Sequence, residues 1–383
     1  MSGVLDGYED WPAYVAAARA ALVERCAGES RLSAALGLPR PVTAPDVRVM
    51  GREARDGLEY TELRWNPGFG PDTAAWLVVP LDADGPLPGV LALHTHGGQK
   101  VIGAEQLVDL GPASVNPTRA MAFRATYHDG LAPAAELARR GFAVLVHDGF
   151  LWGSRRFAGD RRTATSGTPA GAPVALHLPA LAPAPGAVDG GETADEAAAA
   201  DRRSVQLEHR IAKAAGVIGT SVAGTVLHDD LQALAVLAAS DSVDQTRLGA
   251  FGFSGGGARA HLLAAEAPNV RAVVVSCMMT TFAALVPDHI DQHSWLLLTP
   301  GLSRVTDWPE IGRNGDGPND GQRMLAQYAL HDHLFTGDGM RAAHDILTAR
   351  MPLYTGSFHE KTHVFDAEMQ DEAWRFLADS LRA

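Results

Sequence analysis

The stretch RLGAFGFSGGGARAHLL, from Arg247 to Leu263, is the part of the sequence that best predicts the fold. Its run from Leu248 to Phe253 is apolar and typical of a buried strand, and a helix-compatible run begins at Ala258. Between the two runs, residues 252–256 match G-x-S-x-G, in which a serine sits on a sharp strand-to-helix turn. The glycines allow neighbouring backbones to approach closely, and the turn exposes the serine hydroxyl. We therefore expect Ser254 to be a nucleophile rather than a solvated turn residue.

The composition is that of a globular protein of enzyme size. The chain has 383 residues, 46% of them hydrophobic and 20% charged, with a formal net charge of −13. This negative charge argues against a nucleic-acid or anionic-membrane partner. Its two cysteines, Cys26 and Cys277, form neither a disulfide framework nor a zinc-finger spacing. No segment has the pattern of a signal peptide or the length of a membrane span, so we expect a cytoplasmic location.

Apolar patterning predicts strands that alternate with helices along most of the chain. The expected strands are 46–53, 58–65, 74–80, 90–94, 142–147, 248–253, 270–276, 323–329 and 353–358. The expected helices are 8–36, 132–140, 201–239 with a break near 216–219, a helix from 258 onward, and 366–381. Such alternation predicts an α/β fold with a mostly parallel central sheet and helices on both faces.

The chain divides into an N-terminal helical segment and one large domain. The helical segment covers residues 1–40, and the domain covers residues 41–383 with an insertion at about 158–220. Within the insertion, residues 158–200 are rich in proline, glycine and alanine and show almost no periodicity. A linker and a lid over the site both fit this composition, and the position of the segment in the chain favours a lid.

A serine nucleophile requires a base and an acid that orients the base. Asp332 lies just past an expected strand, at the carboxyl edge of the sheet, whereas Asp316 and Asp338 are competing loop carboxylates. His363 lies on the loop directly before the closing helix, and His359 is its nearest competitor. We therefore expect Asp332 to be the acid and His363 to be the base.

Two backbone N–H groups are expected to stabilise the oxyanion that forms during acyl transfer. One belongs to Gly255, at the N-terminus of the helix that follows the serine. The other belongs to Gly98, in the loop 94–98 (HTHGG), where glycine lets the backbone approach a substrate carbonyl. His96, in the same loop, is expected to hold the loop in place rather than to act in catalysis.

Five segments, in this order along the chain, carry a resemblance to a known family. They are HTHGGQKVIG (94–103), LARRGFAVLVHDGFLWGSRRF (137–157), GAFGFSGGGARA (249–260), LAQYALHDHLFTGDGMRAAHDIL (325–347) and HVFDAEMQDEAWRFL (363–377). The chain resembles the dienelactone hydrolase and acetyl xylan esterase branch of the α/β-hydrolase superfamily. The resemblance implies the α/β-hydrolase fold and a triad of Ser254, Asp332 and His363. Two features depart from the family: serine stands where dienelactone hydrolases have cysteine, and residues 158–200 and the N-terminal segment have no counterpart.

The motif after the strand 142–147 also belongs to this resemblance. It reads Trp152-Gly153-Ser154-Arg155-Arg156, and an arginine there could bind a substrate carboxylate. We expect a structural role instead, in which the arginine pairs with Asp148 or with a neighbouring loop.

The function expected from these features is a serine hydrolase that cleaves a carboxylic ester through an acyl-enzyme, without a metal or cofactor. Its ligand is expected to be a small-molecule ester, with no nucleic acid or membrane partner, and a homodimer stays open. Three alternatives remain. The same triad could cleave a C–C bond beside a ketone, His94 and His96 could begin a metal site, or the chain could be a non-catalytic binding member of the fold. Further metal ligands would come from His128, His147, His228 and the HDH at 331–333.

Overall fold

The computed structural model describes residues 7–8, 10–11, 13–14, 30–40, 42–111, 114, 116–157, 194–286, 289–312 and 321–382. Most of the helix expected over 8–36 and most of the proposed lid at 158–200 lie outside these residues, as does Asp316. The division into segments 1–40 and 41–383 stays a prediction.

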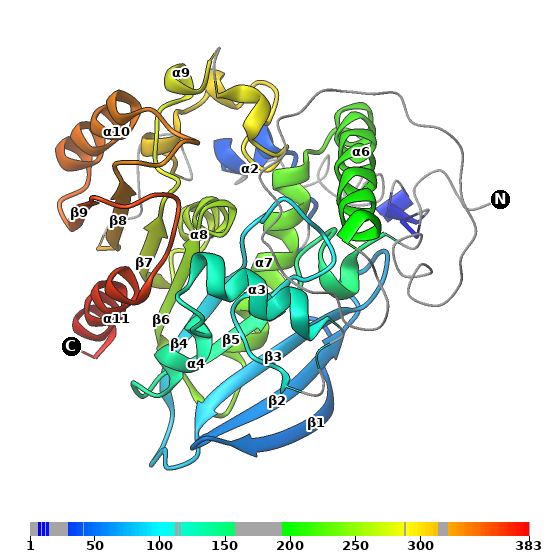
Figure 1. Cartoon of the computed structure of the whole chain (residues 1–383), viewed down its shortest axis with the longest axis vertical. Helices are drawn as coiled ribbons and strands as arrows, with labels where there is room; N and C mark the ends of the chain where they lie inside the picture. The colour runs from blue at the N-terminus through cyan, green and yellow to red at the C-terminus, as the bar shows by residue number, and fades with distance from the viewer. Residues whose placement is uncertain are drawn as a thin grey trace.

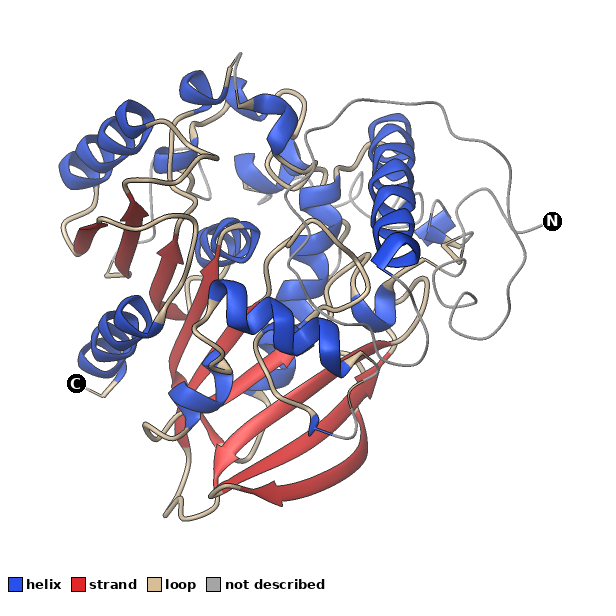
Figure 2. Ribbon diagram, viewed as in Figure 1, coloured by secondary structure: helices blue, strands red, loops and turns tan. Residues whose placement is uncertain are grey.

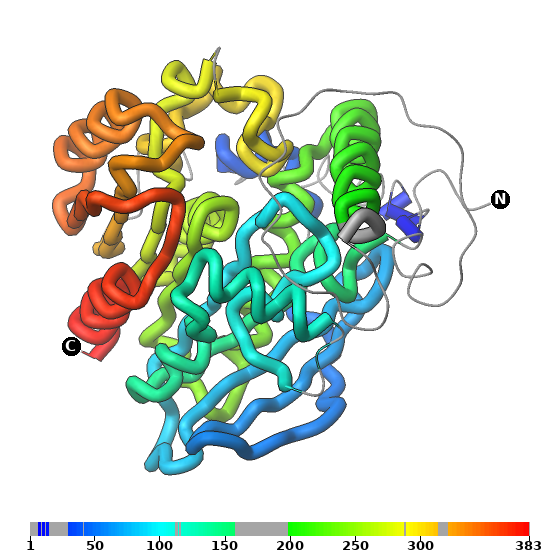
Figure 3. The backbone as a smooth tube through the Cα atoms, viewed as in Figure 1, coloured from blue at the N-terminus to red at the C-terminus, as the bar shows by residue number. Residues whose placement is uncertain are grey.

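A nine-stranded sheet forms the centre of the molecule (Figure 1). Its strands are β1 (Arg48–Arg55), β2 (Leu58–Trp65), β3 (Thr73–Pro80), β4 (Leu87–Leu93), β5 (Ala143–His147), β6 (Val243–Phe253), β7 (Val270–Ser276), β8 (Arg323–Ala329) and β9 (Tyr354–His359). Their order is β1-β2-β3-β5-β4-β6-β7-β8-β9, so the sheet runs from β1 at one edge to β9 at the other (Figure 3). The pairs from β1 to β5 are antiparallel, and all pairs from β5 to β9 are parallel. The expected mostly parallel sheet is therefore confirmed.

Helices cover both faces of this sheet (Figure 2). They are α2 (Arg31–Leu36), α3 (Pro117–Tyr127), α4 (Pro133–Ala138), α6 (Ala194–Ile218), α7 (Val222–Ala238), α8 (Gly255–Glu266), α9 (Phe282–Leu285), α10 (Gly337–Arg350) and α11 (Ala367–Leu381). None of the described helices is long and apolar enough by itself to span a membrane; Ala198–Ile218 and Val222–Ala238 pass that test only as a pair bent by 91°.

The two faces of the sheet carry separate hydrophobic cores, because successive side chains of a strand point to opposite sides. Leu91 and Leu93 of β4 pack in the core that contains residues of α7, α8 and α10. Val90 and Ala92 of the same strand pack in the core that contains residues of α4 and α11. The continuous apolar sequence of β4 reflects this burial on both faces.

Three helices, α3, α9 and α10, were not expected from the sequence. Helix α3 begins with Asn116, whose side chain accepts a hydrogen bond from Arg119 N–H, and with a proline at its first turn. This pair is a recognisable start signal, but a low hydrophobic periodicity follows it. Helix α10 has the N-cap Thr336 and contains two glycines in its first turn, which lowers its intrinsic helix propensity.

A buried ion pair fixes the position of α8 against α7. Arg259 on α8 donates to both carboxylate oxygens of Asp230 on α7, at 2.6 and 3.1 Å, and also donates to the His94 carbonyl at 3.0 Å. His147, at the end of β5, contacts the same carboxylate at 3.0 Å. Burial alone would raise the pKa of Asp230, but Arg259 and His147 outweigh it and lower the pKa. The carboxylate therefore ties α8 to α7 and to the end of β5, while Arg259 itself ties α8 to the end of β4.

Removal of this carboxylate should destabilise the whole domain. Asp230→Ala leaves the Arg259 guanidinium buried and unpaired, so we expect a loss of about 3–5 kcal/mol in unfolding free energy. Urea denaturation measures this loss as a lower midpoint. The control is Glu136→Ala, which removes a half-exposed pair with Arg139 and should cost no more than about 1 kcal/mol. Equal effects of the two variants would contradict the anchoring role.

Candidate active site

The turn between β6 and α8 holds Ser254 in a strained conformation. Its φ of 55° and ψ of −124° are unfavourable for a residue with a side chain. The strain persists because the neighbouring glycines pack against backbone. A Cβ atom on Gly252 would lie 2.0 Å from the Gly256 carbonyl oxygen, and one on Gly256 would lie 2.0 Å from the Leu93 carbonyl oxygen. The sharp turn expected from the sequence is therefore present.

The structure brings Asp332 and His363 together. Asp332 follows β8, His363 follows β9, and His363 Nδ1 lies 2.6 Å from Asp332 Oδ2. A carboxylate only accepts hydrogen bonds, so Nδ1 carries the proton and Nε2 is left as the basic nitrogen. The second carboxylate oxygen of Asp332 accepts from Leu334 N–H at 2.9 Å, which fixes its orientation. Both side chains are buried.

Ser254 and His363 line the same small cavity, of about 60 Å³. Its apolar wall includes Phe253, whose ring centroid lies 4.7 Å from that of His363. The remaining lining residues are Thr95, His96, Gly97, Gly98, Tyr127, Gly255, Gln292, His293, Ser294, Leu297 and Leu334. Four of the five residues expected in the site therefore line one cavity: Ser254, His363, Gly98 and Gly255. The fifth, Asp332, is not among the lining residues and contacts His363.

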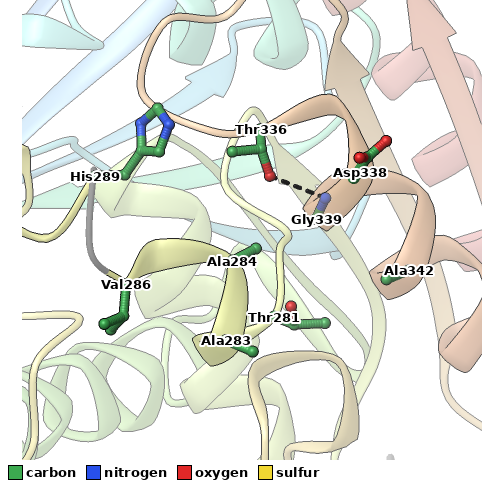
Figure 4. A pocket seen from close by; sticks show the side chains of 9 residues that line it. All are labelled: Thr281, Ala283, Ala284, Val286, His289, Thr336, Asp338, Gly339 and Ala342. Atoms are coloured by element: carbon green, nitrogen blue, oxygen red, sulfur yellow. Dashed lines mark hydrogen bonds between the residues drawn. The ribbon is translucent and has the colours of Figure 1, made fainter.

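The two competitors that the structure describes, Asp338 and His359, lie elsewhere. Asp338 is fully exposed at the start of α10, where it lies 3.5 Å from Arg341. It lines a different cavity, of about 410 Å³, together with residues of α9 (Figure 4). His359 contacts Glu372 at 3.0 Å. Among the described competitors, neither Asp338 nor His359 therefore takes the place of Asp332 or His363.

Both glycines expected to bind an oxyanion donate to protein acceptors in this structure. Gly98 N–H donates to His96 Nδ1 at 3.2 Å, and Gly255 N–H donates to Thr95 Oγ1 at 3.1 Å. Gly97 and Gly98 adopt φ values of 62° and 66°, which only glycine adopts readily. The loop thus has the conformation that its glycines permit, but the N–H groups of Gly98 and Gly255 already donate to protein acceptors.

A buried charged cluster supports this loop from behind. Glu208 of α6 lies 2.9 Å from His96 Nε2 and 2.5 Å from Lys100 Nζ. Its other oxygen accepts from Trp295 N–H at 3.1 Å. Glu208 was not expected in the site, because a residue on a distant helix leaves no spacing pattern near the loop that it contacts. His96 has the structural contacts that were expected of it.

Protonation in this cluster follows from burial and charge. Burial would raise the pKa of Glu208, but Lys100 and His96 outweigh it and hold that pKa well below its usual range. Burial lowers the pKa of Lys100 to about 8, against the opposing effect of Glu208. Burial and the Lys100 charge lower the pKa of His96, so this ring is neutral near pH 7.

The two remaining sequence hypotheses concern His94 and Arg155. His94 Nε2 accepts from Gly149 N–H at 3.2 Å, and no group of three metal-binding side chains occurs among the described residues. The geometry therefore gives the metal alternative no support. Arg155 is buried and structural, but its carboxylate partner is Asp229, at 3.2 Å, and not Asp148. Asp148 instead accepts from the backbone N–H groups of Ala104 and Ser154.

Relief of the strain at residue 254 should be measurable as stability. Ser254→Gly removes the Cβ atom that disfavours this φ, whereas Ser254→Ala keeps it. We expect the glycine variant to be more stable than the alanine variant by about 1 kcal/mol, after the entropy of glycine in the unfolded chain is subtracted. Thermal unfolding of the two variants checks this. An alanine variant at least as stable as the glycine variant would contradict the strain.

No family model matches the sequence. A provisionally named hydrolase of Bacillus subtilis strain 168, YtaP, is 25% identical over 349 residues, which cover 88% of this chain and 92% of YtaP.

Solved structures with the same fold include several esterases. A provisionally assigned acetyl xylan esterase from Bacteroides fragilis superposes with a TM-score of 0.59 and 14% identity, over 92% of this chain and 75% of that one. Acetyl xylan esterase from Paenibacillus sp. R4 superposes with a TM-score of 0.51 and 15% identity, over 99% of this chain and 97% of that one. A glucuronoyl esterase from Solibacter usitatus superposes with a TM-score of 0.53 and 11% identity, over 89% of this chain and 87% of that one. With its nine-stranded sheet and strand-to-helix turn at Ser254, the chain thus has the α/β-hydrolase fold.

Proposed function

We propose that this protein is a serine hydrolase that cleaves carboxylic esters, with Ser254, Asp332 and His363 as its catalytic triad. The observation that carries the proposal is the 2.6 Å contact between His363 and Asp332 beside the cavity that the strained Ser254 also lines. The names of the relatives support it, since YtaP is named as a hydrolase and the superposed structures are esterases. A cytoplasmic location and a small-molecule ester ligand stay predictions from the sequence.

The geometry supports a two-step acyl transfer. His363 Nε2 would accept the proton as Ser254 Oγ attacks the ester carbonyl, and would then return it to the leaving alcohol. Asp332 accepts a hydrogen bond from His363 Nδ1–H and stabilises the imidazolium that forms. Water would then attack the acyl-enzyme carbonyl as His363 accepts its proton. The acid would leave, and His363 would return the proton to Ser254 Oγ. The N-terminus of α8 directs its positive dipole end at the carbonyl oxygen as negative charge develops there.

The cavity favours a small acyl group. Its volume of about 60 Å³ is bounded by Phe253, Leu297 and Leu334 on the apolar side. Polar side chains, Gln292 and His293 among them, line the rest and could contact the alcohol part of the ester. Cleavage of a C–C bond beside a ketone would use the same three side chains, and no contact in this cavity favours it over ester cleavage.

Ser254 should be the residue that reacts covalently. A fluorophosphonate probe is expected to label the wild-type protein at Ser254, and Ser254→Ala should lose about 10³- to 10⁶-fold in kcat on short-chain activated esters while remaining folded. Peptide mapping by mass spectrometry and circular dichroism measure the two results. A β-diketone tested in parallel separates ester from C–C cleavage. Labelling at another residue, or full activity of the alanine variant, would refute the assignment.

Asp332 should be more sensitive than Asp338 to an isosteric change. Asp332→Asn favours the wrong tautomer of His363 and should lower kcat by about 10⁴-fold. Asp338→Asn, which alters an exposed carboxylate in the other cavity, should leave kcat within about twofold. Steady-state kinetics on one activated ester compares them directly. If the losses were reversed, Asp338 would be the acid.

A further inference from the structure

Thr95 lines the cavity beside Ser254, and its hydroxyl can both accept and donate a hydrogen bond. Its oxygen accepts from Gly255 N–H at 3.1 Å. A hydroxyl can also donate one hydrogen bond, and the described residues offer the Thr95 proton no acceptor. Thr95 O–H is therefore a donor, on a residue that lines the cavity, for the carbonyl oxygen of a bound ester.

Thr95 is held rigidly in this position. Its side chain is buried, and its backbone N–H donates to Gln106 Oε1 at 3.0 Å. Gln106 is itself buried, and its amide donates to the Ile102 carbonyl at 3.1 Å. A donor fixed in this way requires little reorganisation when charge develops on a substrate.

The alternative donor, Gly98 N–H, already donates to the His96 ring, and Glu208 fixes the orientation of that ring. Glu208 is ionised and only accepts, so His96 donates from Nε2 and keeps a lone pair on Nδ1. That lone pair accepts from Gly98 N–H at 3.2 Å. Both hydrogen bonds require the same tautomer of His96, and each reinforces the other. To free Gly98 N–H, the loop would have to break a contact that the buried Glu208 cluster supports.

We propose that Thr95 is a further catalytic residue whose hydroxyl donates a hydrogen bond to the oxyanion, in place of Gly98 N–H. The inference rests on the proposed serine hydrolase activity. As Ser254 Oγ bonds to the carbonyl carbon, the π electrons move onto the carbonyl oxygen, and Thr95 O–H stabilises this charge without losing its proton. Gly255 N–H, at the N-terminus of α8, polarises the same hydroxyl and strengthens its donation.

Substitutions at Thr95 test this role. Thr95→Val keeps the shape but removes the hydroxyl, and should lower kcat by about 10²- to 10³-fold with KM changed by less than about threefold. Thr95→Ser keeps the hydroxyl and should stay within about tenfold of wild-type kcat. Thr95→Ala gives the same comparison if the valine variant fails to fold. The matched control is Thr73→Val, which removes a buried hydroxyl of β3 outside the cavity and should leave kcat unchanged.

A transition-state analogue separates oxyanion binding from a merely structural role. A trifluoromethyl ketone forms a tetrahedral adduct with serine, so its affinity should fall in Thr95→Val by the same factor as kcat. If Thr95 were only structural, Thr95→Val would raise KM, or Thr95→Ser would lose as much kcat as Thr95→Val. Either result would overturn the proposal. So would a valine variant whose kcat lies within threefold of wild type.

The fluorophosphonate probe tells this failure from failure of the proposed function. A wild-type protein that is labelled at Ser254 and hydrolyses esters, beside an equally active Thr95→Val, refutes only the role of Thr95. A wild-type protein that is neither labelled nor active on any ester refutes both.

Discussion

The backbone of Ser254 is held at a φ of 55° by the close packing of β6, α8 and β4. On one side its N–H donates to the Ser276 carbonyl at 2.8 Å, and on the other its carbonyl accepts from Ala258 N–H at 3.1 Å. Gly256 must approach the Leu93 carbonyl too closely for any side chain. The buried pair of Arg259 and Asp230 anchors the following turn of α8. The sheet, two helices and an ion pair thus together hold the backbone of this one residue in its strained conformation.

The acid and the base meet because their loops run paired beyond the ends of two parallel strands. Strand β8 pairs with β9 up to Ala329 and His359. The pairing continues past the strands, where Leu330 N–H donates to the His359 carbonyl at 2.8 Å and His331 N–H donates to the Lys361 carbonyl at 2.9 Å. Asp332 and His363 follow directly, so parallel register brings two residues 31 positions apart to hydrogen-bonding distance.

The Glu208 cluster gives the site a different kind of support. Buried ion pairs contribute little net stability, because desolvation offsets their attraction, but removal of one partner is costly. Here the pair of Glu208 with Lys100 joins helix α6 to the loop that carries His96, and Trp295 N–H joins a third segment to the same carboxylate. The cluster therefore fixes geometry at the cavity rim, including which N–H groups remain available to a substrate.

The sequence by itself determined the features that depend on local backbone conformation. G-x-S-x-G predicted the turn at Ser254, the ends of expected strands placed Asp332 and His363 at one sheet edge, and the apolar runs predicted a mostly parallel sheet. Helices α3 and α10 were not expected from the sequence. The hydrophobic periodicity of α3 is weak, and the glycines in the first turn of α10 lower its helix propensity.

Only the tertiary structure decided which partners the polar groups of the site take. Gly98 was expected to offer a free N–H, yet His96 accepts it, and His96 is oriented by Glu208, a residue 112 positions away. Arg155 pairs with Asp229 rather than with the nearby Asp148. A short motif can encode a turn because its own atoms clash or fit. Hydrogen-bond partners from distant elements are chosen by how those elements pack, and no local pattern contains that information.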